Sequence, residues 1–249
     1  MQDMKGKLAV ITGGSTGIGL ATAKALVQRS ARVILFARDP KALAAAQAEL
    51  GPAASTVSGD VCVAADLERL FAQAREQTSS IDALFVNAGV AEFVALERAD
   101  LQHYERVMDT NVKGAFLTMK HALPLLGPGS SVVFNTSVAA AIGAPRCSVY
   151  GASKGAVTAF ARNLAAELLP RGVRINMLAP GPTATPILEK APVDATGQLE
   201  MAPFVAARMR MGRLGSVEEI AEAAAFLLSP RSSFIVAQEL CADGGMVGI

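Results

Sequence analysis

Short apolar runs recur along the chain, and longer amphipathic segments separate them. Most of these runs are rich in Val, Ile, Leu and Phe on successive positions, which is typical of strands covered on both faces. They lie at Leu8–Ile11, Arg32–Phe36, Ser55–Ser58, Ala83–Val86, Val132–Asn135 and Arg174–Leu178. We therefore expect each of them to form a buried strand.

The intervening segments carry apolar residues at steps of three and four, the period of an amphipathic helix. They lie at Gly17–Arg29, Pro40–Leu50, Val63–Thr78, Tyr104–Leu126, Val149–Leu169 and Val217–Leu228. Pro40 suits a first helical turn, and Ser216 suits an N-cap. Regular alternation of strand and helix predicts an α/β fold, a single-domain Rossmann-type doubly wound parallel sheet of about seven strands.

Residues that directly follow the strands are the candidates for a binding site, because ligands of doubly wound sheets bind at the carboxyl edge. No linker divides residues 1–249, so we expect one domain. One segment departs from the alternation: Pro186–Gly212 has prolines, glycine and methionines but no strand pattern. It is either an ordinary surface excursion or a mobile lid over a site.

The composition excludes several classes of protein. Of the 249 residues, 51% are apolar and 18% are charged, which is far from the composition of disordered chains. The 23 Lys and Arg residues against 22 Asp and Glu residues give a net charge of +1. Because nucleic-acid and anionic-membrane binders usually carry a basic excess, we expect neither partner and favour a small-molecule substrate.

The cysteines and the N-terminal segment bear on location. Cys62, Cys147 and Cys241 lie far apart and have no metal-ligand spacing, so we expect reduced thiols and no metal site. The apolar run after Lys7 is too short for a signal-peptide core, and no run is long enough to span a membrane. The predicted location is cytoplasmic.

A glycine-rich segment, Thr12–Gly19, follows the first predicted strand and opens the first predicted helix. Such a turn brings backbone N–H groups and the positive end of the helix dipole to a pyrophosphate. No Lys-Ser or Lys-Thr follows, so the segment is not a P-loop. Its Gly-x-x-x-Gly-x-Gly spacing differs from the usual dinucleotide pattern, and a purely structural turn is the alternative. The candidate pyrophosphate ligands are Gly13, Ser15, Thr16, Gly17, Ile18 and Gly19.

The end of the second predicted strand bears on the choice of cofactor. An acidic residue there selects NAD, whereas a cation without that acid selects NADP. Ala37 is uncharged and Arg38 can present its planar guanidinium to a 2′-phosphate, so we favour NADP(H). Asp39 could instead pair with Arg38 or cap the helix that begins at Pro40, and a solvated Arg38 is the alternative.

Tyr150 is one of only two tyrosines, and Lys154 follows it by four residues. Together with Ser137 and the glycine-rich turn, this spacing resembles the compact branch of the short-chain dehydrogenase/reductase family. The resemblance covers nearly the whole chain. It also includes Asp60, Asn87-Ala88-Gly89, Asn111, Pro180-Gly181 with Thr185, and a tail that ends at Asp243-Gly244-Gly245. Ala237 departs from the family pattern, which usually has glycine there.

The resemblance implies hydride transfer between a nicotinamide cofactor and a small ketone, aldehyde or secondary alcohol. Tyr150 would be the general acid or base, and Ser137 would hydrogen-bond the reacting oxygen. Lys154 lies one helical turn from Tyr150, where an ammonium at about 4 Å would lower the pKa of the phenol. The family also implies that Asn111 interrupts a helix and holds a water that links Lys154 to solvent. Without the family, Asn111 is a helix residue that bonds backbone.

The remaining implied residues would place the cofactor. Asp60 would accept a hydrogen bond from the adenine amino group. Asn87 and Gly89 would let the chain pass close to the adenosine ribose, and Thr185 would hold the nicotinamide carboxamide. Asp60 and Thr185 could equally be a cap and a turn residue. Val61, Ala88, Pro180, Gly181 and Thr183 complete the implied set, to which Tyr150 and Lys154 also belong.

Several functions stay open. Reduction of 3-oxoacyl groups on acyl carrier protein is one, although the loop Leu125–Gly129 has no cation and Arg171 alone is a weak docking site. Enoyl reduction is disfavoured, because members of the family that perform it space Tyr and Lys more widely. A non-catalytic NADP-binding regulator is less favoured, since no catalytic group is missing.

Three further residues lie outside this chemistry or at its border. Cys147 would line the substrate side as a small hydrophobic residue. His103 and His121 match no catalytic position, and we interpret them as surface or helix-packing residues. The segment Ala91–Phe93 and the possible lid would complete a mostly apolar pocket.

Small residues on the helix that carries Tyr150 would allow close approach of another helix. They are Ala152, Gly155, Ala156 and Ala159. The family resemblance implies a homotetramer with 222 symmetry. The alternative is that these residues pack against the protein's own sheet.

Overall fold

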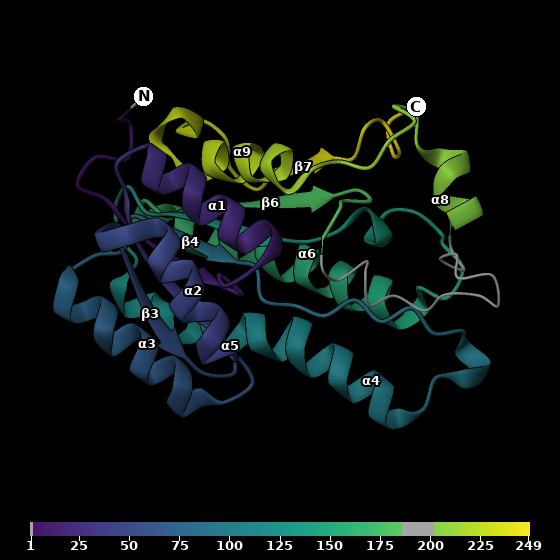
Figure 1. Ribbon diagram of the computed structural model, residues 1–249, viewed down its shortest axis with the longest axis horizontal. Coiled ribbons are helices and arrows are strands. Elements are labelled where there is room, and N and C mark those ends of the chain that lie inside the picture. Colours follow the sequence, from purple (N-terminus) through teal and green to yellow (C-terminus); the bar gives the residue numbers. More distant parts are fainter. Residues whose placement is uncertain (1, 186–201) are drawn as a thin grey trace.

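A single seven-stranded parallel sheet, with helices on both faces, forms the centre of the molecule (Figure 1). The computed structural model describes residues 2–185 and 202–249. The strand order is β3-β2-β1-β4-β5-β6-β7, and every neighbouring pair is parallel. The strands are β1 (Leu8–Thr12), β2 (Arg32–Ala37), β3 (Ala54–Ser58), β4 (Ala83–Val86), β5 (Ser131–Asn135), β6 (Arg174–Pro180) and β7 (Glu239–Ala242). The predicted doubly wound fold is confirmed.

All six strands expected from the apolar runs are present, with ends that shift by two residues at most. The seventh, β7, has the sequence ELCA and is only partly buried, so no apolar run identifies it. It pairs with β6 alone and forms one edge of the sheet. Its existence depends on this pairing more than on its own composition.

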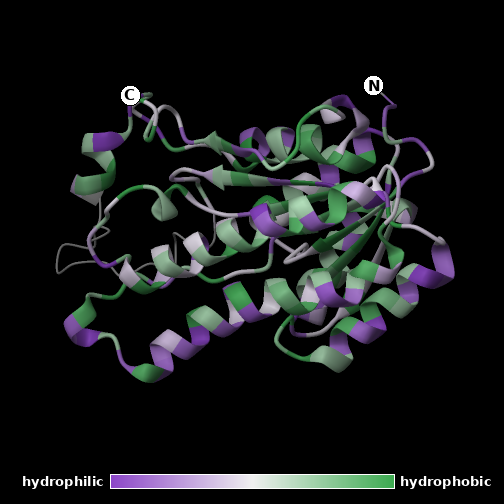
Figure 2. Ribbon diagram, turned by 180° about the vertical axis from the view of Figure 1, so that it is seen from behind, coloured by the Kyte–Doolittle hydropathy of each residue, from purple (hydrophilic) through white to green (hydrophobic). Residues whose placement is uncertain are grey.

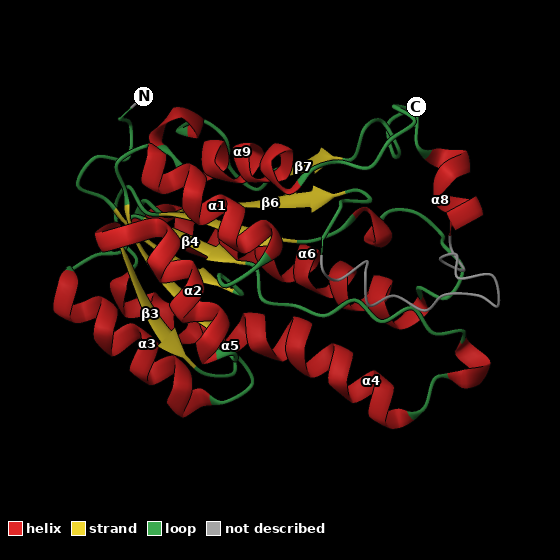
Figure 3. Cartoon of the chain, in the orientation of Figure 1, coloured by secondary structure: helices red, strands yellow, loops and turns green. Residues whose placement is uncertain are grey.

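The helices cover the two faces of the sheet (Figure 3). They are α1 (Gly17–Gln28), α2 (Pro40–Leu50), α3 (Ala64–Gln77), α4 (Leu101–Met108), α5 (Gly114–Ala122), α6 (Ser148–Leu168), α8 (Ala202–Arg208) and α9 (Val217–Leu228). Pro40 occupies the first turn of α2, as predicted. Ser216 caps α9 in a reciprocal capping box with Glu219, which confirms the predicted N-cap.

The prediction of one helix over Tyr104–Leu126 is wrong in its start, its end and its continuity. It begins three residues earlier because the Asp100 carboxylate accepts from the backbone N–H of His103 at 2.7 Å, an N-cap. A π-helical turn, η3 (Asp109–Lys113), separates α4 from α5. After α5 the chain tightens into the 3₁₀ turn η4 (Leu123–Leu125), which contains Pro124.

Two apolar layers hold the sheet, one on each face. In β1, Leu8 and Val10 face the layer covered by α3, α5 and α6, whereas Ala9 and Ile11 face the layer covered by α1, α2 and α9. The central strands are mainly apolar, and the helices alternate polar and apolar residues (Figure 2). Because both faces are buried, the carboxyl edge of the sheet remains as the surface where loops gather.

The segment predicted as a surface excursion or lid is described in part. Residues 186–201 lie outside the described residues, and Ala202–Arg208 forms α8, which the sequence pattern did not predict. In the described ranges, none of the helices has the length and apolar character needed to cross a membrane.

Candidate active site

A cavity of about 770 Å³ lies at the carboxyl edge of the sheet. Loops that follow β1 to β6 all contribute to its walls. The predicted site residues that line it are Gly13, Ser15, Thr16, Gly17, Ile18, Arg38, Asp60, Val61, Asn87, Ala88, Gly89, Ser137, Tyr150, Lys154, Pro180, Gly181, Thr183 and Thr185. Only Gly19 and Asn111 of the predicted set are not among the lining residues.

The glycine-rich turn crosses from β1 to α1 by closely spaced backbone contacts. The N–H of Gly13 donates to the carbonyl of Phe36 at 2.8 Å. Gly19 lies against the carbonyl of Gly13, so any side chain at this position would collide with backbone. Gly19 therefore supports the turn from behind the cavity wall, whereas the residues before it face the cavity.

The N-terminal end of α1 is open toward the cavity. Its N-cap, Thr16, makes no side-chain cap hydrogen bond, and the first turn holds no acidic residue. The helix thus presents unsatisfied N–H donors and a positive dipole end beside Ser15 and Gly17. This arrangement fits an anionic group such as a pyrophosphate.

At the end of β2, Arg38 is exposed and lines the cavity, and its guanidinium has no partner within residues 2–185 and 202–249. The Asp39 carboxylate accepts from the N–H of Lys41 at 2.9 Å and of Ala42 at 3.3 Å. Of the two alternatives for Asp39, the cap is therefore the one observed. Arg38 remains available to a ligand.

Asp60 follows β3 and lines the cavity. One of its carboxylate oxygens accepts from the N–H of Cys62 at 2.9 Å, so the side chain also caps its own turn. The second carboxylate oxygen is not used in this bond. Asp60 can thus serve as a turn residue and still accept a hydrogen bond from a ligand.

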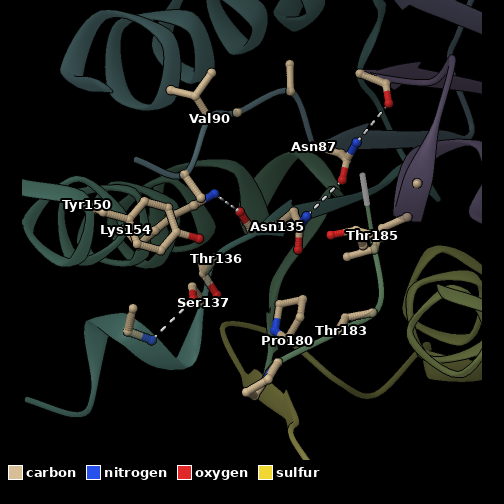
Figure 4. A pocket seen from close by; sticks show the side chains of 18 of the residues that line it. Asn87, Val90, Asn135, Thr136, Ser137, Tyr150, Lys154, Pro180, Thr183 and Thr185 are labelled. Atoms are coloured by element: carbon tan, nitrogen blue, oxygen red, sulfur yellow. Dashed lines mark hydrogen bonds between the residues drawn. The ribbon is translucent and has the colours of Figure 1, made fainter. Parts of the chain in front are cut away.

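Asn87 joins three strand ends instead of pointing only at a ligand (Figure 4). Its side-chain N–H₂ donates to the carbonyls of Thr12 at 3.0 Å and Gly13 at 3.1 Å, and its Oδ1 accepts from Asn135 at 2.8 Å. These bonds fix the floor of the cavity between β1, β4 and β5. In contrast, the Oδ1 of Asn135 is buried without a hydrogen-bond partner within the described ranges.

The unpaired Oδ1 of Asn135 indicates that a ligand binds here. A buried acceptor without a donor costs about 1–3 kcal/mol, and a bound molecule with an N–H or O–H group could remove this cost. Together with the open end of α1 and the free guanidinium of Arg38, it indicates that the cavity fits a nicotinamide dinucleotide.

Tyr150 and Lys154 lie one turn apart on α6, and both face the cavity (Figure 4). The Lys154 ammonium donates to the backbone carbonyl of Asn135 at 2.8 Å and lies 6.0 Å from the centre of the Tyr150 ring. The Ser137 hydroxyl hydrogen-bonds the Tyr150 phenol and also accepts from the N–H of Ala139 at 3.1 Å. Three of the four side chains predicted to be catalytic thus meet in one wall.

Burial controls the titration of this cluster. It raises the pKa of Tyr150, and the hydrogen bond from Ser137 only partly opposes the increase. Burial also lowers the pKa of Lys154 to about 8. The sequence predicted that Lys154 lowers the pKa of Tyr150; in the protein's own groups the net shift is upward, because burial disfavours the charged phenolate. Tyr150 is therefore protonated at neutral pH and ready to act as an acid.

Asn111 lies in the π-helical turn, so the helix is interrupted where the family resemblance implied. Its side chain accepts from the N–H of Val90 at 2.8 Å and donates to the Val90 carbonyl at 3.0 Å and to Ser153 at 2.9 Å. Asn111 thus also hydrogen-bonds backbone groups, as the alternative interpretation expected. Asn111 connects the loop after β4 to α6.

Gly89 separates Asn111 from Lys154. A Cβ at this position would stand 3.0 Å from Asn111 Oδ1 and 3.4 Å from Lys154 Nζ. Only glycine leaves this space open between the amide oxygen and the ammonium. Asn111 Oδ1 and Lys154 Nζ therefore both lie close to Gly89.

The loop after β6 forms the opposite wall. The Gly181 N–H donates to the Ala242 carbonyl at 3.0 Å, and the Thr183 hydroxyl donates to the Gly181 carbonyl at 2.9 Å. Thr185 lines the cavity on the same side (Figure 4). This loop therefore ends above the cavity, opposite Tyr150 and Ser137.

The substrate side is mostly apolar, as predicted. Phe93 packs its edge against the Tyr150 ring with centroids 5.6 Å apart. Cys147 is buried in the wall, and burial raises the pKa of its thiol to about 11, so it behaves as a small neutral side chain. Phe204 and Met209, from α8 and the residue after it, close this end of the cavity.

Sequence reasoning missed Asn135 and misplaced Glu92, which it put with Ala91 and Phe93 in the wall of the pocket. Asn135 had no signal beyond its place at the end of a strand. Glu92 does not line the cavity; its carboxylate accepts from Arg106 at 3.1 Å and lies 3.0 Å from the His103 ring. His103 is only 3% exposed, so helix packing, and not the surface, is the correct interpretation for this residue.

Comparisons with known proteins agree with this geometry. The sequence profile of a family described as "Enoyl-(Acyl carrier protein) reductase" matches residues 13–247. Oxidoreductase asL5 of Sarocladium schorii is 40% identical over 100% of this chain and 99% of its own length. 2-(S)-hydroxypropyl-CoM dehydrogenase 3 of Xanthobacter autotrophicus is 34% identical over 99% of this chain and 98% of its own.

Solved structures show the same architecture. One, a short chain dehydrogenase/reductase family protein, has a TM-score of 0.87 at 34% identity and covers 100% of both chains. The 3-ketoacyl-(acyl-carrier-protein) reductase from Brucella melitensis, complexed with NADH, has a TM-score of 0.88 at 29% identity. That match covers 98% of this chain and 99% of the other.

Proposed function

Because the chain belongs to the short-chain dehydrogenase/reductase family, we propose that it transfers a hydride between NADP(H) and a small ketone, aldehyde or secondary alcohol. The coarse activity, an oxidoreductase acting on CH–OH or C=O, follows from the family. The observation that carries the finer proposal is the meeting of Ser137, Tyr150 and Lys154 in one wall of a cavity that also fits a dinucleotide.

In the direction of reduction, a carbonyl compound, NADPH and a proton become an alcohol and NADP⁺. A bound reduced nicotinamide would supply the hydride to the carbonyl carbon. Tyr150 gives its phenolic proton to the carbonyl oxygen, and the C=O double bond becomes a C–O single bond. The Ser137 hydroxyl donates a hydrogen bond to the same oxygen as negative charge develops on it.

Tyr150 must then regain a proton. Lys154 is the nearest cation on the same helix, and its Nζ and Asn111 Oδ1 both lie close to Gly89. We assign to Lys154 and Asn111 the passage of this proton through a bound water, and to Lys154 also the binding of the nicotinamide ribose. Burial of Lys154 supports this role, because it lowers the pKa to about 8 and so eases proton release.

The preference for NADP(H) rests on Arg38. Ala37 ends β2 without a carboxylate, and Asp39 turns its carboxylate to the N-terminus of α2. Asp39 uses only Oδ1 in this cap and also lines the cavity, but Arg38 is the group at this strand end whose charge has no partner within the described ranges, and a guanidinium can bind a 2′-phosphate. The solved Brucella protein was complexed with NADH, so both cofactors must be titrated.

The test is NADPH oxidation by the purified protein with a panel of ketones and aldehydes. We expect turnover with at least one compound class, and Tyr150→Phe should lower kcat at least about 10²-fold because no acid then replaces the phenol. Tyr104→Phe, which changes the chain's other, exposed tyrosine, is the matched control and should keep full activity.

NADPH binding by Tyr150→Phe should stay within about twofold of the unaltered protein, as measured by fluorescence titration. Full turnover in Tyr150→Phe would remove Tyr150 from the chemistry. Tight NADPH binding without turnover of any carbonyl compound would favour the non-catalytic regulator instead.

A 3-oxoacyl thioester on acyl carrier protein is the second candidate, because the Brucella structure is named for this reaction. The surface does not support it. The loop Leu125–Gly129 carries no cation, and the Arg171 guanidinium is engaged by the carbonyls of Leu123 at 3.0 Å and Leu126 at 2.9 Å. Equal kcat/KM for the same acyl group on acyl carrier protein and on a small thiol would confirm that no protein docking occurs.

We also propose that the protein assembles as a tetramer. The support is that Ala152 and Ala159 on α6 are exposed and that nothing lies within 4 Å of the position of a Cβ at Gly155. Phe116 on the neighbouring α5 is 47% exposed beside Phe160. Sedimentation that shows only monomer at micromolar concentration would contradict this assembly.

A further inference from the structure

The catalytic end of the cavity is the wall that carries Ser137, Tyr150 and Lys154, and the adenine end is the part beside Arg38 and Asp60. The reacting groups of the catalytic end come from two elements. Ser137 follows β5, whereas Tyr150 and Lys154 belong to α6. These elements must keep a fixed separation, because the acid and the hydrogen-bond donor have to meet at one substrate oxygen.

Within the described ranges, the direct hydrogen bonds between the end of β5 and α6 are made by the reacting groups themselves. Lys154 Nζ donates to the Asn135 carbonyl at 2.8 Å, and Ser137 hydrogen-bonds the Tyr150 phenol. In the proposed reaction Tyr150 loses its proton, Lys154 passes one on, and Ser137 turns to the substrate oxygen. These bonds therefore rearrange in each turnover, and they are poorly suited to hold the wall in place.

A carboxylate from the edge strand connects the same two elements without a part in the reaction. Glu239 is the first residue of β7, and its Oε1 accepts from the Thr136 hydroxyl at 2.8 Å and from the Thr158 hydroxyl at 2.9 Å. Thr136 lines the cavity directly before Ser137 (Figure 4). Thr158 lies one turn after Lys154 on α6. Glu239 itself is not among the lining residues.

The hydrogen bond from Thr158 departs from the usual behaviour of a buried threonine in a helix. Thr22 in α1 and Thr118 in α5 are also buried, and each donates to the carbonyl four residues earlier in its own helix, at 2.8 Å and 2.7 Å. Thr158 is 9% exposed and donates away from its helix to Glu239. A carboxylate accepts the stronger, charge-assisted hydrogen bond, so Glu239 holds this donor.

The Thr136 hydroxyl has a second acceptor, the carbonyl of Leu178 in β6, at 3.0 Å. The backbone N–H of Thr136 donates to the same carbonyl at 2.8 Å. These bonds fix Thr136 to the sheet but not to α6. Of the bonds that Thr136 makes, the one to Glu239 is therefore the one that leads on to the helix.

We propose that Glu239 is a positioning residue for the hydride transfer: its carboxylate holds the strand end before Ser137 against the helix that carries Tyr150. This assignment rests on the proposed function. Glu239 acts through its two threonines and does not touch the reacting atoms. An inward-facing charge on an edge strand can also serve only to discourage pairing with another chain, so the experiment has to separate the two roles.

Glu239→Met removes the acceptor and keeps the length of the side chain. With NADPH and an accepted ketone, we expect kcat to fall about 10-fold, because a displaced donor and acid lose part of their effect. The Kd for NADPH should stay within about twofold, since the adenine end is unchanged. Glu239→Gln keeps an oxygen acceptor at the same place, and it should bring kcat back to within about threefold of the unaltered protein.

Glu167→Met, which removes an exposed carboxylate from α6, is the matched control and should leave kcat unchanged. Thr158→Val breaks only the helix side of the bridge, so it also serves if Glu239→Met does not fold, and it should lower kcat at least about threefold. The double variant should be no slower than Glu239→Met alone, because both changes break one bridge.

Three results would overturn the inference and leave Glu239 as a residue that only protects the sheet edge or supplies charge. They are an unchanged kcat in folded Glu239→Met, losses that multiply in the double variant with Thr158→Val, and an equal loss of kcat in Glu239→Gln and Glu239→Met.

Crystal structures separate this inference from the proposed reaction, because they require no turnover. In Glu239→Met the hydrogen bond between Ser137 and Tyr150 should be lost, whereas in Glu239→Gln it should be kept. Loss of this bond in a protein that reduces no carbonyl compound would refute the proposed reaction and keep the assignment of Glu239. Turnover by the unaltered protein, with the bond and kcat both preserved in Glu239→Met, would do the opposite.

Discussion

The adenine end and the catalytic end of the cavity are built in different ways. The adenine end takes its walls from the tight turns after β1 to β3, and each of its groups follows a strand directly. The catalytic end takes its walls from the loops after β4, β5 and β6 and from α8, which are distant in the sequence. The first is fixed by local backbone, and the second by tertiary packing.

This difference teaches which changes should act on binding and which on chemistry. At the adenine end, charge and backbone N–H groups meet a ligand at the protein surface, so a change there should alter the affinity for the cofactor. At the catalytic end, burial governs the protonation of Tyr150 and Lys154, so a change there should alter kcat or its pH dependence.

The largest effect should come from Ser137→Ala at the catalytic end. Loss of the donor to the reacting oxygen is expected to lower kcat by about 10²–10³-fold. The affinity for NADPH should remain within about twofold, as steady-state kinetics and fluorescence titration would show. Ser148→Ala, an exposed serine at the start of α6, is the control and should leave kcat unchanged. If Ser137→Ala lowered the NADPH affinity and left kcat unchanged, Ser137 would act in cofactor binding and not in the chemistry.

Arg38→Ala should give the opposite pattern at the adenine end. Without the guanidinium, the Kd for NADPH should rise about 10–100-fold, because one charge-assisted contact is lost. Binding of NADH should change little, and kcat at saturating NADPH should be preserved. Lys41→Ala removes a nearby exposed cation that does not line the cavity, and it should leave both affinities unchanged. If NADH binding weakened equally, Arg38 would have no role in the choice of cofactor.

Lys154 joins the two ends, and its burial has a consequence for stability. Its pKa is about 8 in the folded protein against an ordinary 10.5, so between these values the unfolded chain binds more protons and the free energy of unfolding rises with pH. Relative to Lys154→Met, the unaltered protein should gain about 2 kcal/mol between pH 7 and pH 10 in urea unfolding. The same comparison for Lys41→Met should show no such gain, and a gain of equal size there would show that Lys154 is not its source.

The smallest effect is expected away from both ends. Ala237 has a φ of +58°, the left-handed conformation that glycine adopts at low cost, so the departure from the family pattern noted in the sequence is a strained residue. Ala237→Gly should raise the free energy of unfolding by about 1 kcal/mol in chemical denaturation. kcat and the affinity for NADPH should not change. A destabilised variant would show that the alanine side chain contributes more by packing than it costs in strain.

The adenine end could be predicted from the sequence because its information is local. The turn between β1 and α1 and the strand-end residues Arg38 and Asp60 follow directly from where strands end. Six strands and most helix limits were predicted for the same reason, since burial on both faces leaves a clear apolar run. The choice for Asp39 needed the structure, because a cap and an ion pair have the same sequence signature.

The catalytic end could be predicted only in part. The Tyr150–Lys154 spacing gave the reacting groups, but not the sign of the pKa shift, which depends on burial by Phe93 and other residues far away in the chain. The π-helical turn, the pair of Glu92 and His103, and α8 likewise depend on contacts between distant segments. Edge strand β7 was missed because it is short and none of its residues is fully buried, so it leaves no apolar run.

Deuterium tracing tests most directly that the two ends form one site that transfers hydrogen to a carbonyl carbon. The unaltered protein would reduce an accepted ketone with NADPH carrying two deuterium atoms at nicotinamide C4, and mass spectrometry would locate the label. The account predicts one deuterium on the carbinol carbon, and none on carbon when unlabelled NADPH is used in heavy water. Deuterium delivered to that carbon from the solvent, with the cofactor label retained, would contradict it.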